Sequence, residues 1–419
     1  MRFLRSSFEK AAHVASWATH ALFGGFRAAR RELSGSRAPR PTPWAISFLV
    51  TARCMLKCQH CFYHYATSTP ATELTLDEYR ALSRHLGPFT VGLFCGGEPY
   101  LRPDLGEIIS LLRRNHGVPL AATTTNGQLQ SSVVSQTEAI LRADRLKPFG
   151  VGFSMDGPQE IHDEIRGKGS FERTLRTYRE VKRLARHYPN LSLTVTTVVN
   201  AINQHVAADF VRWSARELAP SSSCVLLVRQ DPRAGESLKA VDLARYREAQ
   251  DAAVGSMRSG PLWRRLRPDA AYLETVARHV EETRVSGSRS FHCWAGVNGA
   301  LIDPVGMVQV CEVFPEHDLG QIGSLRDVGM DFGALWSSPR ADAMRAHVNH
   351  HAACATCTHE TMGHATSLPF SPNLGRLAGL LRRGRPDLTS PARGESRSIA
   401  SGPALVPIER LRQRPSATP

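Results

Sequence analysis

The sequence lacks the long apolar runs that a membrane-spanning chain needs. No stretch approaches eighteen uninterrupted apolar residues, so no transmembrane helix is expected. A disulfide framework is not expected either, because nine cysteines are an odd number and most of them fall in two tight groups of a 419-residue chain. Such cysteine usage is typical of metal ligation in a reducing compartment, which predicts a cytoplasmic protein.

Acidic residues are too few to balance the basic ones, and the excess of positive charge lies in two tails. The net charge is +14, of which residues 1–40 and 366–419 supply +6 each, so the body between them is nearly neutral. Enzymes that act on nucleic acid more often carry basic surface on the folded body. We therefore expect no nucleic-acid partner and leave open an anionic partner for the tails.

Residues 1–34 place apolar side chains such as Leu4, Phe8 and Leu22 on one helical stripe. Two interpretations remain open: a helix packed on the body, or an amphipathic helix on an anionic membrane, which would make the protein membrane-peripheral. Histidines and charges within the segment do not fit a signal peptide. A linker follows up to residue 43, and residues 366–419, rich in Pro, Ser, Gly and Arg, are expected to be a largely disordered tail.

Between the tails, an apolar strand, a polar turn and an amphipathic helix repeat six times. The strands read as apolar on both faces, which is typical of a parallel sheet covered by helices. Six units are too few for a closed eight-stranded barrel, so the predicted fold class is α/β, a partial (β/α)6 TIM-type barrel over residues 44–235. The expected strands are residues 45–51, 90–96, 119–125, 149–155, 191–199 and 223–229.

Polar motifs follow four of these strands. They are "CMLKCQHC" after the first strand, "GGEP" (96–99) after the second, "TNG" (125–127) after the third and "MDG" (155–157) after the fourth. Because chemistry in α/β folds gathers at the carboxyl ends of the strands, we expect the active site on this rim.

The first cysteine group, Cys54, Cys58 and Cys61, is spaced C-x3-C-x2-C without a fourth cysteine. Thiolates bind zinc or iron–sulfur clusters. A closed zinc site would need a fourth ligand from His60 or from elsewhere. A [4Fe–4S] cluster held by three thiolates leaves one iron free to bind a substrate or cofactor. The spacing favours the cluster and leaves zinc open.

The C-x3-C-x2-C motif, "GGEP" and the segment "SMDGPQEIHDEIRGKGSF" (154–171) together resemble the radical S-adenosylmethionine (SAM) superfamily, over about residues 45–360. The resemblance implies a [4Fe–4S] cluster on Cys54, Cys58 and Cys61 whose fourth iron chelates SAM. It also implies reductive cleavage of SAM to a 5′-deoxyadenosyl radical that abstracts a hydrogen atom from a substrate. The SAM-binding residues that the resemblance implies are Phe62, Gly96, Gly97, Glu98, Ser154 and Arg166. Arg166 as an ordinary helix cation and Phe62 as core packing are the structural alternatives.

The second cysteine group combines C-x12-G-x4-C (Cys293, Gly306, Cys311) with C-x2-C (Cys354, Cys357). It resembles the start of the SPASM extension and, since no cysteine follows Cys357, its shortened Twitch form with one auxiliary [4Fe–4S] cluster. A zinc site is the alternative. We expect residues 291–365 to form a small β-hairpin and helix iron–sulfur domain after a helical connection, residues 236–290. The remaining cysteines, Cys95 and Cys224, are expected to be buried apolar residues.

The resemblance predicts an oxidoreductase, because an auxiliary cluster with four protein ligands can accept an electron from the substrate radical. His359 and Glu360 are candidates for the base that this oxidation needs; the alternative is that both are ordinary surface residues. A one-electron donor such as flavodoxin or ferredoxin would be a partner. The substrate is a small molecule, a peptide or a lipid; a maturase of ribosomally made peptides and a lipid-modifying enzyme are the alternatives, and the basic N-terminus leans toward a lipid. From another class, a non-catalytic iron–sulfur electron-transfer protein would have no use for a SAM pocket.

Overall fold

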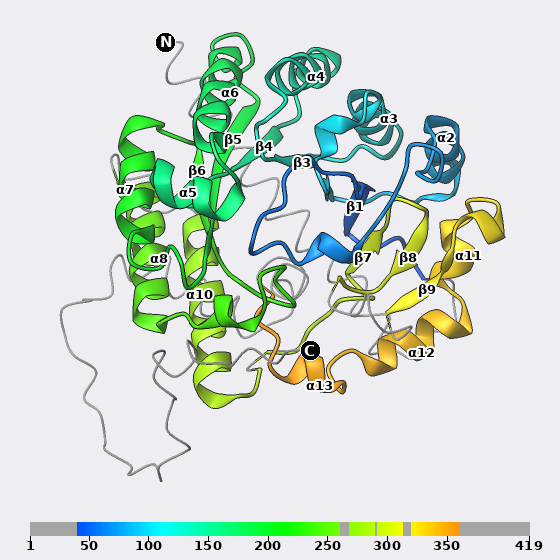
Figure 1. Ribbon diagram of the computed structural model, residues 1–419. Coiled ribbons are helices and arrows are strands. Elements are labelled where there is room, and N and C mark those ends of the chain that lie inside the picture. The colour runs from blue at the N-terminus through cyan, green and yellow to red at the C-terminus, as the bar shows by residue number, and fades with distance from the viewer. Residues whose placement is uncertain (1–39, 260–267, 290, 313–319, 360–419) are drawn as a thin grey trace, which may run out of the picture. The chain divides into compact units, whose positions relative to one another are not determined.

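One sheet of nine strands runs through the described part of the chain, in the order β6-β5-β4-β3-β2-β1-β7-β8-β9 (Figure 1). The computed structural model describes residues 40–259, 268–289, 291–312 and 320–359. The expectations for residues 1–34, for the tail from residue 366 and for Glu360 lie outside the described residues.

The first six strands are parallel and follow one another in chain order across the sheet. Each lies within two residues of the segment that the sequence predicts, and the α/β fold with an open, partial barrel is confirmed. The strands are β1 (Ala45–Thr51), β2 (Val91–Gly96), β3 (Leu120–Thr125), β4 (Phe149–Ser154), β5 (Leu191–Val199) and β6 (Ser222–Leu227).

Helices cover the outside of this sheet (Figure 1). The first of them begins at a capping box, in which Thr75 and Glu78 bond to each other's backbone N–H groups. The helices between the strands are α2 (Leu76–His85), α3 (Leu105–His116), α4 (Gln130–Ala143), α5 (Gln159–Arg166), α6 (Ser170–Leu184) and α7 (Ala207–Glu217). After β6 come α8 (Leu243–Arg258) and α10 (Pro268–Ser286), and short 3-10 turns are η1 (Tyr63–Tyr65), η2 (Pro99–Leu101), η3 (Glu236–Lys239) and η4 (Arg326–Val328).

The main hydrophobic core lies between the sheet and these helices. Phe48 of β1 is fully buried, stacks on Phe94 of β2 with ring centroids 5.1 Å apart, and meets Tyr79 of α2 at 6.3 Å. The alternation of a strand therefore sends every second side chain outward into this core.

The inner face of the sheet is more polar than the sequence predicts. The prediction of strands that are apolar on both faces is wrong for β4, β5 and β6. Buried and half-exposed residues alternate along all three strands. An open barrel leaves its inner face accessible, and on β4 and β5 this face carries mainly glycine and hydroxyl side chains. Leu93 of β2, Val198 of β5 and Leu226 of β6 are apolar residues on the same face. The half-exposed inner residues include Gly150, Gly152, Ser154, Ser192, Thr194, Thr196, Ser222 and Cys224.

The C-terminal strands extend the same sheet beyond β1. The predicted hairpin is present as β7 (Gly299–Ile302) and β8 (Met307–Gln309), with β9 (Gln321–Ser324) beside it. Strand β7 pairs in parallel with β1, Ala45 lying opposite Gly299. The helices that follow are α11 (Phe332–Trp336), α12 (Pro339–His347) and α13 (Ala352–Ala355). The domain boundaries given above stay predictions, but the sheet itself is continuous across them.

Replacing Phe48 by Ala tests the core between sheet and helices. Removing a fully buried phenyl ring leaves a cavity and should lower the free energy of unfolding by about 3–5 kcal/mol. The measurement is urea denaturation, with Leu146→Ala as the control because Leu146 is 81% exposed. A loss of stability in Phe48→Ala no larger than in the control would contradict this core assignment.

Candidate functional site

The ends of strands β1 to β4 bring the four predicted motifs to one rim of the sheet. Thr51 at the end of β1 lies opposite Gly96 at the end of β2. Thr125 at the end of β3 pairs with Phe153, one residue before the end of β4. The carboxyl ends of the strands therefore carry the cysteine loop (residues 52–62), "GGEP", "TNG" and "MDG" side by side, as the sequence predicts.

Gly96 and Gly97 lie where two chain segments cross at close range. The Gly97 N–H donates to the Thr51 carbonyl (2.7 Å) and the Glu98 N–H donates to the Arg53 carbonyl (2.8 Å). A Cβ on Gly96 would overlap the carbonyl oxygen of Thr51, one on Gly97 would overlap that of Arg53, and Gly96 has a φ of +125°. Glycine is required here to let the cysteine loop leave β1 across the end of β2.

Glu98 is buried at this crossing, with 1% of its surface exposed. Its carboxylate accepts hydrogen bonds from the Thr125 hydroxyl (2.9 Å) and from the backbone N–H groups of Asn126 (2.7 Å) and Tyr100 (3.3 Å). Burial raises the pKa of Glu98 to about 7, against the lowering effect of these donors. Both carboxylate oxygens are thus engaged within the protein, where they tie the end of β2 to the end of β3.

The first three cysteines share one loop at the centre of the rim. Cys58 is buried, Cys61 half-buried and Cys54 exposed. Burial raises the pKa of the Cys58 thiol to about 11, and the nearby Cys61 and Cys54 raise it further while Arg166 lowers it. Neighbouring segments clamp the loop, because the Gln59 N–H donates to the Ile165 carbonyl (2.9 Å) and the Arg233 N–H to the Cys61 carbonyl (3.1 Å).

Arg166, at the last turn of α5, points into this loop. Its guanidinium donates to Asp156 (2.6 Å), lies 3.9 Å from the sulfur of Cys58 and is 3.4 Å from the ring of His60. Burial raises the pKa of Asp156, but Arg166 and His60 outweigh it and hold that pKa at about 2. Asp156 therefore stays ionised and keeps the guanidinium beside the cysteine loop.

The other two predicted SAM-binding side chains lie on the same rim. Phe62 is half-buried, and the Arg229 guanidinium lies over its ring at 5.5 Å. Ser154 is half-buried at the end of β4, with Thr196 as its register partner on β5. The structure brings all six predicted residues around the cysteine loop, and their contacts with SAM stay predictions.

The second thiol group lies beyond β7 and β8. Burial raises the pKa of the Cys357 thiol to about 11, and the nearby Cys293 and Cys354 raise it further. Cys311 is buried in the same hydrophobic cluster as Cys293 and Cys354. Asn349 holds the backbone of Cys293 with two hydrogen bonds. Its side-chain oxygen accepts from the Cys293 N–H (2.8 Å), and its amide donates to the Cys293 carbonyl (2.9 Å).

A shared backbone feature makes both groups suitable for thiolate ligands. The sulfur of Cys293 accepts from the N–H of Ala295 (3.5 Å) and that of Cys357 from the N–H of His359 (3.4 Å). The sulfurs of Cys54 and Cys61 likewise accept from the backbone N–H two residues further on. Such donors stabilise negative charge on sulfur, as bound iron–sulfur clusters require. Within the described ranges, no three His, Cys, Asp or Glu side chains converge on one metal ion.

A polar cluster that the sequence analysis missed joins the two cysteine loops. The carboxylate of Glu312, next to Cys311, accepts from the Arg229 guanidinium (2.9 Å) and pairs with the buried ring of His359. The side chain of Gln230 donates to the backbone carbonyl of Glu312 (2.9 Å). Arg229 also covers Phe62, next to Cys61. No spacing rule connects these residues, since Glu312 and the residues just after β6 meet only in the fold. Cys95 and Cys224, expected to be buried, are half-buried on the inner faces of β2 and β6.

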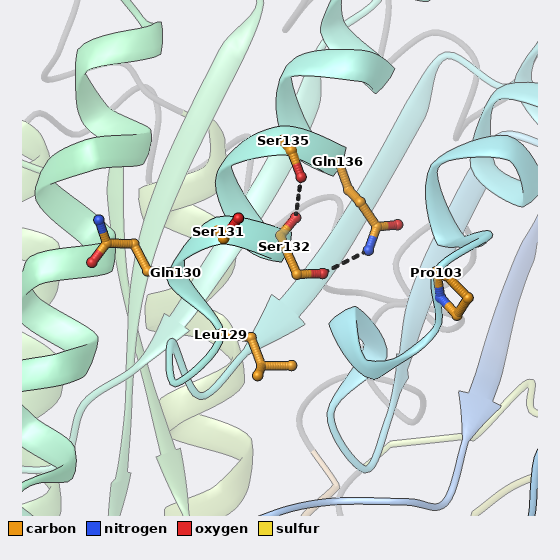
Figure 2. A pocket seen from close by; sticks show the side chains of 7 residues that line it. All are labelled: Pro103, Leu129, Gln130, Ser131, Ser132, Ser135 and Gln136. Carbon is orange, nitrogen blue, oxygen red and sulfur yellow. Dashed lines mark hydrogen bonds between the residues drawn. The ribbon is translucent and has the colours of Figure 1, made fainter.

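A shallow pocket lies beside the start of α4 (Figure 2), and none of its lining residues belongs to the cysteine loop. Ser132 forms its polar centre and accepts from the side chain of Gln136 (2.8 Å). Pro103 and Leu129 complete its wall. In the part of the chain that the structure describes, no helix is long and apolar enough to cross a membrane.

The fold and the two thiol groups define a radical SAM enzyme with an iron–sulfur extension, and family comparison agrees. Residues 48–213 match the radical SAM superfamily, and residues 293–358 match the SPASM iron–sulfur cluster-binding domain. The chain belongs to the radical SAM superfamily, in the branch with a SPASM domain. Its cofactors are accordingly SAM and [4Fe–4S] clusters. The residues present suit such clusters, because the thiols are grouped and backbone N–H groups donate to their sulfurs.

Particular relatives make different products. Pre-heme d1 synthase of Dinoroseobacter shibae is 26% identical over 78% of this chain and 82% of that protein. Mycofactocin maturase MftC of Mycobacterium ulcerans is 26% identical over 76% and 80%. Fe-coproporphyrin III synthase of Methanosarcina barkeri is 38% identical, but the match spans about a third of each chain, 30% and 31%. Among solved structures, Streptococcus suis SuiB has a similar fold, with a TM-score of 0.53 at 15% identity over 76% of this chain and 72% of that one.

The raised pKa of Glu98 predicts a pH-dependent stability. Its folded pKa of about 7 lies above the ordinary 4.5, so the folded state binds the extra proton between these values. Stability should therefore fall as pH rises from about 4.5 to about 7, by at most about 1.4 kcal/mol per pH unit, and level off above. Urea denaturation of the unloaded protein across this range measures the slope.

Glu98→Gln should flatten this part of the pH profile. Glu78→Gln is the matched control, because Arg326 and the other partners of Glu78 outweigh its burial and hold its pKa at about 2, below the tested range. A Glu98→Gln profile that keeps the full wild-type slope would show that another group is responsible.

Proposed function

We propose that this radical SAM enzyme is an oxidoreductase, in which Cys54, Cys58 and Cys61 hold the SAM-binding cluster and the second thiol group holds an electron-accepting auxiliary cluster. When bound, the first cluster and SAM supply a radical able to take a hydrogen atom from an unactivated C–H bond. The observation that carries the proposal is the pair of thiol groups, each with backbone N–H donors on its sulfurs, joined through Glu312 and Arg229.

The chain's own residues would hold and shield the reacting groups. Arg166, fixed by Asp156, keeps its guanidinium beside Cys58 and His60, where its two Nη groups would be the donors to a carboxylate such as that of SAM. Phe62 offers an aromatic face beside the cysteine loop, and Ser154 a hydroxyl at the end of β4. His359, buried against Glu312, stays a candidate base for the oxidation, and Glu360 lies outside the described residues. A flavodoxin or ferredoxin would supply the electron.

The inner face of the sheet supports a polar substrate. Hydroxyls of Ser192, Thr194 and Thr196 line β5 and can bond to main-chain amides, while their neighbours on β4, Gly150 and Gly152, carry no side chain. An apolar polyprenyl chain would find few apolar partners on these strands. We therefore place a peptide segment ahead of a lipid as the substrate, in agreement with the similarity to a mycofactocin maturase over most of both chains.

A tetrapyrrole is the second candidate substrate. The similarity to pre-heme d1 synthase also covers most of both chains, 78% of this one and 82% of that one. Anaerobic titration with iron coproporphyrin, followed by its absorption band, would separate the two. A stoichiometric spectral change would favour the tetrapyrrole and contradict the preference for a peptide.

Anaerobic reconstitution with iron and sulfide, then reduction with SAM present, tests the radical SAM assignment. The protein should release 5′-deoxyadenosine and bind about eight irons, as two [4Fe–4S] clusters require. Replacing Cys54, Cys58 and Cys61 by Ala should abolish the 5′-deoxyadenosine and leave about half of the iron. Full iron without 5′-deoxyadenosine in the wild type would instead point to a non-catalytic electron-transfer protein.

Replacing Cys354 and Cys357 by Ala tests the electron-accepting role. Cleavage of SAM should continue, because the first thiol group is intact, while oxidised product should disappear. Asn349→Ala is a useful companion, since it loosens Cys293 without removing a thiol. A cysteine variant with native-like melting that still forms product at the normal yield would show that the second cluster is not the acceptor.

A further inference from the structure

Asn126, the first residue after β3, is held by hydrogen bonds on nearly every side. It is 8% exposed, and its backbone N–H donates to the Glu98 carboxylate (2.7 Å). Its backbone carbonyl accepts from the Thr174 hydroxyl (2.6 Å) and from the Gln128 side chain (3.0 Å). The residue is therefore fixed to β2 on one side and to α6 on the other.

These contacts also determine which way the side-chain amide faces. The Asn126 side-chain oxygen accepts from the Gln128 N–H (3.0 Å), a bond that only an oxygen can make. The amide nitrogen must then face the other way, where it lies 3.6 Å from the sulfur of Cys54 and 3.2 Å from the sulfur of Met55. Its two hydrogens thus meet two sulfurs of the cysteine loop.

This donor differs in kind from the backbone N–H groups on the cysteine sulfurs. The N–H group that donates to Cys54 belongs to Leu56 of the same loop, and the one that donates to Cys61 belongs to Tyr63, directly after the loop. Asn126 instead belongs to the rim of the sheet, anchored through Glu98 and Thr174. A donor fixed in the scaffold orients a ligand more strictly than one carried by the same loop.

Building on the proposed function, we propose that Asn126 is a positioning residue for the first cluster: its amide orients the Cys54 thiolate and raises the reduction potential of the cluster. A hydrogen bond to a ligand sulfur stabilises the reduced form more than the oxidised one, because the reduced cluster carries one more negative charge. Without this donor, the cluster should be harder to reduce.

The test compares the reconstituted full-length wild type, Asn126→Ala and Thr174→Val by redox titration followed with electron paramagnetic resonance. The signal to follow is the one that changes when SAM is added. Asn126→Ala should lower the equilibrium constant for one-electron reduction by about three- to tenfold, tenfold being 59 mV. Thr174→Val is the control, because it removes one hydrogen bond to the Asn126 carbonyl, while the Gln128 side chain and Glu98 still hold the residue and its amide remains.

Each outcome separates the possibilities. A lower potential in Asn126→Ala with an unchanged potential in Thr174→Val supports the direct contact between amide and sulfur. Equal shifts in both variants would contradict a direct effect of the amide and mean that Asn126 only supports the loop. An unchanged potential in Asn126→Ala at full iron content would overturn this inference and leave the proposed function standing. A wild type without any SAM-sensitive, Cys54-dependent signal overturns the proposed function and this inference together.

Discussion

Two hydrogen bonds at the crossing of β1 and β2 hold the site in place. The N–H groups of Gly97 and Glu98 bond to the carbonyls of Thr51 and Arg53, at a distance that no side chain on either glycine would permit. Arg53 is already part of the cysteine loop, and Cys54 follows it directly. The position of the three thiols therefore depends on these two backbone hydrogen bonds. The other partners of the loop add to a placement that the crossing determines.

Charge within the site is arranged around buried, fully bonded groups. Glu98 ties together the ends of β2 and β3, Asp156 orients Arg166, and Glu312 holds Arg229 and His359. The partners of Asp156 and Glu312 outweigh their burial and keep both pKa values at about 2, whereas the donors to Glu98 do not, and its pKa stays raised. These carboxylates and their partners thus hold the segments around the two thiol groups, although none of them is a predicted cluster ligand.

Local spacing predicted the thiols and the rim, because ligands of one cluster lie on short loops and strands alternate with helices in a regular period. It placed Asn126 on the same rim as Cys54, but it could not predict that the Asn126 amide meets the Cys54 sulfur or that Arg229 pairs with Glu312, since these residues are far apart in the chain. The polarity of the inner face was also misread. Glycine and threonine also occur in buried strands, so the sequence alone does not show that these residues of β4 and β5 lie on an accessible face. The alternating burial of the two strands shows it.

The pairing of β7 with β1 has a consequence for the order in which the protein is made. Strand β1 emerges early from the ribosome, but its partner at Gly299 follows only after the whole barrel and the helices α8 and α10. Until then one edge of β1 offers unpaired backbone groups, the kind of edge that promotes aggregation of nascent chains. Biosynthesis of this protein thus includes a long interval in which the strand that leads into the cysteine loop is paired on one side alone.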